Sequence, residues 1–109
     1  MMEDEIGRLR HRVTIQYPAR SDDEAGGAMI AWGPLATVWA QIKLRSGRET
    51  FEADSPSARS IYRVVIRYRS DVDPTMRLLW GDRVLQVVAV GDEDGTKRWL
   101  SCECEEYGP

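Results

Sequence analysis

The sequence predicts an all-β protein, a small β-barrel or sandwich of about six strands with a long inserted loop. Two observations predict this class. Apolar side chains recur at every second position in several short runs, and turn residues separate these runs. The chain has 109 residues, enough for one hydrophobic core, so we expect a single domain over residues 1–109. A barrel is favoured over a sandwich because closure removes sheet edges.

The expected strands follow one another in short steps. They cover residues 10–17, 29–32, 36–43, 61–69, 76–80, 83–90 and 97–105. A polar stretch from Pro18 to Ala28 is expected to form a turn or long hairpin loop, and Gly81-Asp82 fits a tight two-residue turn. Alternation predicts which side chains form the core: Val13, Ile15, Val38, Ile42, Val64, Ile66, Val88, Leu100 and Cys102.

Residues 44–60 do not fit the strand pattern and are too polar for a core. We interpret them as the long inserted loop. Ser46 and Glu49 have the spacing of a capping box, so a short helix can begin there. A connection of this length is uncommon in a small domain and is often functional. An ordinary surface insertion is an equally good interpretation at this point.

Composition excludes several classes of function. The chain is 42% apolar and 30% charged, with a formal net charge of −3, which argues against a protein that grips nucleic acid by neutralising phosphates. The first residues are acidic rather than basic, and no apolar run approaches the roughly 18 residues of a membrane span. We therefore expect synthesis in the cytoplasm and no membrane partner.

No constellation of residues predicts an enzyme. The one histidine, His11, lies between two arginines with no nucleophile beside it, so we interpret it as structural. Cys102 and Cys104 are two apart on an expected strand, which suits neither a disulfide between them nor a zinc site. We interpret them as buried thiols. The carboxylates of residues 92–94 are expected in a solvated turn. No catalytic residue, cofactor or metal is predicted.

Two features point to an interface. Trp39 lies on the opposite face of its strand from Val38 and Ala40, and large aromatics on both faces of a sheet are typical of contact surfaces. Packing beneath the long loop explains Trp39 equally well. Arg63, Arg67 and Arg69 share one face of the next strand. In an acidic chain we expect this arginine row to pair with carboxylates of a neighbouring strand or subunit.

The order of short motifs resembles the phage head–tail joining proteins over nearly the whole chain. The opening segment, residues 6–16, is similar to their start. Further similarities are Trp32, residues 36–42, Ser46-Gly47-Arg48-Glu49, residues 62–69 with Asp71-Val72 and Met76-Arg77, Arg98-Trp99-Leu100, and Cys104-Glu105-Glu106. One departure is Leu44-Arg45, where the family often has Pro-Leu.

The resemblance implies a structural, homo-oligomeric head-closure or stopper ring in the neck of a virion, phage, prophage or gene transfer particle. Such a ring lies below the portal and adaptor proteins, retains packaged double-stranded DNA, and meets the tail-terminator or tail proteins. It also implies that residues 44–60 form a channel loop, with Ser46, Gly47, Arg48, Glu49, Glu52 and Asp54 as candidate gate residues. The alternatives are another neck ring, such as a tail-completion protein, and an OB-like nucleic-acid-binding module.

Overall fold

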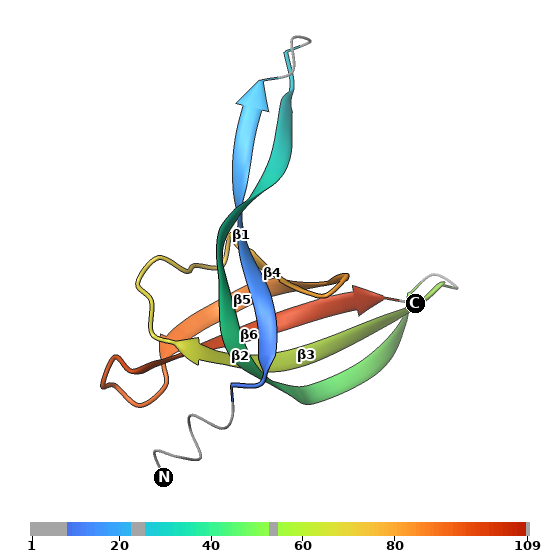
Figure 1. Cartoon of the computed structure of the whole chain (residues 1–109). Coiled ribbons are helices and arrows are strands. Elements are labelled where there is room, and N and C mark those ends of the chain that lie inside the picture. Colours follow the sequence, from blue (N-terminus) through green and yellow to red (C-terminus); the bar gives the residue numbers. More distant parts are fainter. Residues whose placement is uncertain (1–8, 23–25, 53–54, 109) are drawn as a thin grey trace.

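Six antiparallel strands form a closed barrel in the order β1-β2-β3-β6-β5-β4 (Figure 1). The computed structural model describes residues 9–22, 26–52 and 55–108, and for residues 46–52, 55–58 and 108 it describes the backbone alone. The strands are β1 His11–Asp22, β2 Ala28–Glu52, β3 Ser55–Arg67, β4 Arg77–Trp80, β5 Arg83–Asp92 and β6 Trp99–Gly108. The predicted all-β class is confirmed.

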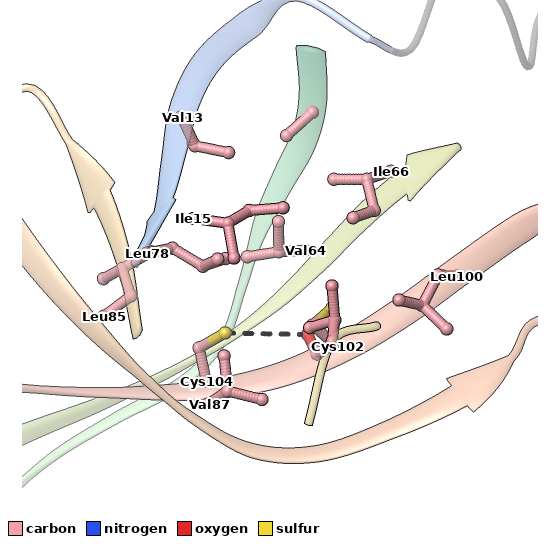
Figure 2. Close-up of a cluster of buried hydrophobic side chains, with 12 residues drawn as sticks. Val13, Ile15, Val64, Ile66, Leu78, Leu85, Val87, Leu100, Cys102 and Cys104 are labelled. Atoms are coloured by element: carbon pink, nitrogen blue, oxygen red, sulfur yellow. Dashed lines mark hydrogen bonds between the residues drawn. The ribbon is translucent and has the colours of Figure 1, made fainter. Parts of the chain in front are cut away.

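The core fills the barrel with aliphatic side chains and the two thiols (Figure 2). Most of the predicted core is confirmed, since the following side chains are buried: Val13, Ile15, Val64, Ile66, Leu100 and Cys102. Val38 and Ile42 are partly buried and pack against this cluster. The prediction for Val88 is wrong, because its side chain is 41% exposed.

A β-bulge in β5 explains the error at Val88. The ladder with β6 pairs Val87 with Cys104 and then Ala89 with Glu103, so Val88 is an extra residue without an opposite partner. An extra residue reverses the alternation of side chains beyond it. Val87 therefore points into the core, and Val90 rather than Val88 resumes the partly buried face.

The first two strands are longer than the sequence predicts. β1 continues to Asp22, through much of the expected loop, and β2 runs unbroken through Gly33-Pro34. A β-bulge replaces the expected break. Ile15 pairs with Ala36 and Gln16 with Pro34, so Leu35 is an extra residue without a partner in β1. Proline is tolerated at such irregular positions. The glycine is needed for space, since a Cβ at Gly33 would lie 2.8 Å from Cζ of Tyr17.

The predicted long loop is also corrected. Residues 44–52 belong to β2 and residues 55–60 to β3, and the pairs run from Leu44↔Tyr62 to Glu52↔Ser55. These described residues form strand, not the loop or short helix expected there. A capping-box spacing is a weak local signal, and it gives way here to pairing with a neighbouring strand. A bulge leaves Arg45 unpaired at the start of this β2–β3 extension.

Candidate interaction surfaces

A hollow of about 510 Å³ lies beside the first residues of the barrel. Its described lining residues are Leu9, Val38, Trp39, Arg67, Tyr68 and Arg69. We call it the Trp39 hollow. Trp39 is 50% exposed, and the guanidinium of Arg12, its neighbour in the ladder, lies 4.8 Å from the centre of the indole ring. An apolar wall with arginines at its rim can accept an apolar side chain that stands beside a carboxylate.

The structure brings three of the four predicted interface residues together and separates the fourth. Trp39, Arg67 and Arg69 line the same hollow, whereas Arg63 lines another, of about 340 Å³, with Arg45 and others. The Nη2 atom of Arg63 donates a hydrogen bond to Oε1 of Glu93 at 2.6 Å. This carboxylate belongs to the turn that follows β5, not to a neighbouring strand or subunit, which is where a partner for the arginine row was expected.

Arg69 and Arg67 differ in whether a carboxylate neutralises their charge. Arg69 donates two hydrogen bonds to Asp71, from Nε at 3.0 Å and from Nη2 at 2.9 Å, and these bonds lower the pKa of Asp71. Arg67 stacks instead on the ring of Trp99, 5.5 Å from its centre. Within the described residues neither Arg67 nor Arg12 forms an ion pair. Among the residues that the structure describes, the rim of the Trp39 hollow therefore carries positive charge that no carboxylate balances.

A second surface is a two-stranded arm that stands away from the barrel (Figure 1). It consists of residues 17–22 of β1 and 28–33 of β2, paired from Tyr17↔Gly33 to Asp22↔Ala28. We call it the β1–β2 arm. The ring of Trp32, at its base, is covered by Arg77, which also donates to Gln16 at 2.7 Å. Further out, Met29 and Ile30 are 61% and 59% exposed.

The β2–β3 extension leaves the barrel in a different direction from the arm (Figure 1). Its base is three strands wide, because Ser60 pairs both with Gly47 and with Glu106 of β6. The ladder places the predicted gate residues Ser46, Gly47, Arg48, Glu49 and Glu52 on this extension, while Asp54 lies outside the described residues. Arg59, near the base, forms an ion pair of 3.3 Å with Glu105.

A polar cluster that no pattern in the sequence predicts joins the strands of the barrel. Arg83 Nη2 donates to the hydroxyl of Tyr62 at 2.6 Å and to Glu106 at 2.7 Å, and its guanidinium covers the ring of Trp80 at 4.2 Å. His11 meets the same indole ring edge-on at 5.1 Å. The five residues come from five strands, so no local spacing connects them. They hold the barrel together and leave no nucleophile beside a base.

Metal-ligand geometry is absent from the described residues, in which no group of three His, Cys, Asp or Glu side chains converges. Cys102 and Cys104 are free and buried, and burial raises the pKa of both thiols. The Asp92 carboxylate accepts from the backbone N–H groups of Gly95 and Lys97, at 3.1 and 2.8 Å. The Asp92 side chain thus closes that turn through the backbone N–H groups of the turn itself. No helix of the described chain is long and apolar enough to cross a membrane.

The fold and its surfaces define a class of protein: a small all-β barrel with projecting hairpins and an aromatic hollow, suited to contacts with other proteins. The chain belongs to the phage head completion protein family, whose model matches residues 5–107. It is 30% identical over 106 residues to head completion protein gp7 of Enterobacteria phage HK97, covering 91% of this chain and 95% of that protein.

Solved structures agree with this assignment. A chain in the virion of a native gene transfer agent particle superposes with a TM-score of 0.79 at 26% identity, covering 93% of this chain and 96% of its own. The solution structure of protein SF1141 from Shigella flexneri 2a has a TM-score of 0.69 at 29% identity, covering 93% and 95%. The family resemblance read from the sequence is therefore confirmed.

Proposed function

We propose that this head completion protein is the head-closure, or stopper, subunit of the neck of a tailed phage or gene transfer particle. Copies of the chain form a ring below the portal and adaptor proteins, retain the packaged double-stranded DNA, and offer the tail its attachment surface. The observation that carries the proposal is the β2–β3 extension, a paired hairpin that projects beyond the barrel of a head completion protein.

In the proposed ring the extension lines the DNA channel. Pairing makes it stiffer than a loop of the same length, and the base is stiffer still, because β6 pairs with it there. Gly47 lies in this three-stranded base, so a hinge at Gly47 is disfavoured. The extension would move as a paired finger that bends beyond Ala58, where β2 and β3 pair only with each other among the described residues.

The charges of the extension suit a passage rather than a binding site. Arg45, Arg48 and Arg59 are nearly balanced by Glu49, Glu52 and Asp54 in the sequence. Arg59 is also neutralised by Glu105. A ring of such fingers would attract phosphate weakly, so DNA could leave when the gate opens. A strongly basic lumen would hold the DNA and slow its release.

The test shortens the extension without disturbing the barrel. Residues 49–58 are replaced by Asn-Gly, a two-residue hairpin turn, between the paired residues Arg48 and Arg59. Particles that join tails but leak DNA support the gate. Particles that retain DNA and fail only in tail joining show that the extension is a docking element and that the gate is wrong.

The double variant Glu49→Gln with Glu52→Gln keeps the full length of the extension and is the control for the shortened variant. Because it keeps the finger and makes it more basic, it should retain DNA at least as well as the unaltered chain. A strain lacking the chain altogether tests the broader role. It should accumulate DNA-filled or leaking heads without tails, and normal tailed particles would overturn the head-closure assignment.

A further inference from the structure

We propose that the tip of the β1–β2 arm of one subunit inserts into the Trp39 hollow of the next copy, and that this contact builds the ring. The inference rests on the proposed function, because that function requires a ring. It goes further by assigning the two halves of the subunit contact to named residues: Met29, Ile30 and Asp22 on the arm, and Trp39, Arg12 and Arg67 at the hollow.

The arm has apolar side chains that the subunit itself does not cover. Beyond Gln16 its two strands pair only with each other among the described residues, and a ribbon of two strands is marginally stable alone. Met29 and Ile30 are neighbours, so they point to opposite faces of the ribbon, and both are about 60% exposed. A flat surface would cover only one of them, whereas a hollow covers both.

The Trp39 hollow suits the tip of the arm in size and in polarity. Its volume of about 510 Å³ is within the range of protein cavities that bind ligands, and Val38, Trp39 and Leu9 give it an apolar wall. An exposed tryptophan in a concave setting is a typical anchor point for a partner. Two apolar side chains at the end of a narrow ribbon are a suitable occupant.

Charge favours the same pairing. The arginines Arg12 and Arg67 beside the hollow form no ion pair within the described residues; each lies over a tryptophan ring instead. The tip carries the opposite sign: Asp22 is exposed, Asp23 and Glu24 follow it in the sequence, and Arg20 is the one cation of residues 17–33. Complementary charges would set the orientation of the contact and disfavour pairing of two tips.

Geometry makes the contact one between copies. Trp39 pairs with Arg12, near the start of β1, and Met29 pairs with Ser21, near its end. Nine residues of extended strand separate them, about 30 Å. Figure 1 shows the arm standing away from the barrel at the far end of β1 from its first residues. An arm cannot reach the hollow of its own chain. Two different patches that fit each other produce a head-to-tail contact, and such contacts form a ring where the rotation between copies closes.

Cysteine cross-linking in assembled particles tests the contact. Cys102 and Cys104 are fully buried, so Met29→Cys and Arg67→Cys introduce the reactive thiols. After mild oxidation the double variant should give a ladder of covalent multimers of this chain on a denaturing gel without reductant. Each single variant should remain monomeric. Dimers from Met29→Cys alone would mean tip-to-tip contact and would overturn the inference, as would a cross-link to another neck protein.

A second measurement does not depend on oxidation. Trp39→Ala and Met29→Asp should each lower the number of subunits per particle about tenfold or more, the effect of losing a central anchor. Val88→Ala, which shortens a similarly exposed apolar side chain elsewhere on the barrel, should leave the number unchanged. Circular dichroism of each pure variant establishes that it is folded.

The results of these experiments distinguish the arm–hollow contact from the head-closure role on which it rests. If the double cysteine variant enters tailed, DNA-filled particles without forming a ladder, the arm–hollow contact is wrong and the head-closure role stands. If the unaltered chain is missing from particles, and its loss leaves tailed particles normal, the head-closure role fails and the contact fails with it.

Discussion

Arg83 and Glu106 meet through two parallel hydrogen bonds, from Nε to Oε2 at 2.9 Å and from Nη2 to Oε1 at 2.7 Å. This fork joins β5 to β6, and the link from Arg83 to Tyr62 extends it to β3. Charge-assisted pairs with two bonds are stronger and better oriented than single ones. In a barrel with a small core, such a contact fixes how the strands lie against one another.

The Arg83–Glu106 pair predicts a dependence of stability on pH. Hydrogen bonds from Arg83 lower the pKa of Glu106 below its ordinary value of 4.5. Because the folded state holds the ionised form, the stabilisation is complete above about pH 4.5 and is lost as the pH falls through the lower, folded pKa. Glu106→Gln should therefore cost about 1 kcal/mol or less at pH 7, since both side chains keep some exposure.

Urea unfolding of the unaltered chain and of Glu106→Gln, at pH 7 and at pH 3, measures this effect. The difference in unfolding free energy should shrink at the lower pH. Asp82→Asn, at an exposed carboxylate in the Gly81-Asp82 turn, is the control and should not give the same trend. A difference that is constant from pH 7 to pH 3 would contradict the assigned role of Glu106.

A second prediction concerns the core. Ile66 is fully buried, so Ile66→Ala should cost about 2–5 kcal/mol of unfolding free energy. Val88→Ala should cost about 1 kcal/mol or less, because the bulge turns Val88 outward. Urea denaturation of both variants decides the matter, and equal losses would mean that the face of β5 is assigned incorrectly.

A third prediction concerns the thiols. Burial raises the pKa of Cys102 to about 12 and raises that of Cys104 as well, so neither forms appreciable thiolate at pH 8. Iodoacetamide should leave the native protein unmodified while it alkylates both cysteines in urea. Mass spectrometry counts the added groups, and rapid modification of a thiol without denaturant would show that the barrel opens locally.

Strand alternation was enough to predict the all-β class and most of the core, because side chains such as Val64 and Ile66 follow a strict period of two. Bulges escape this reasoning. An inserted residue at Leu35, Arg45 or Val88 leaves no mark in composition, and each is visible only once the partner strand is known. The same limit hid the true length of β2, since a strand of polar residues resembles a loop in sequence.

The surfaces were predictable only in part. Trp39 and the arginine row stood out by residue type, yet only the fold shows that Trp39, Arg67 and Arg69 line one hollow while Arg63 pairs elsewhere. One half of the arm was missed, because the polar residues after Tyr17 suggested a loop, whereas the strand at residues 29–32 was predicted. Exposed Met29 and Ile30 were the signal available, and they gain meaning only when the ladder shows that they project.

The last prediction concerns assembly. We expect the isolated subunit to be monomeric or weakly associated, with the ring forming on the adaptor. One tip in one hollow is a small contact, and a template that holds several copies raises their effective concentration, so contacts too weak to persist alone close together. Analytical ultracentrifugation of the pure chain at micromolar concentration should show a monomer, and Trp39→Ala should sediment in the same way. A stable ring at that concentration would contradict assembly on a template. Loss of that ring in Trp39→Ala, but not in Val88→Ala, would still locate its contact at the hollow.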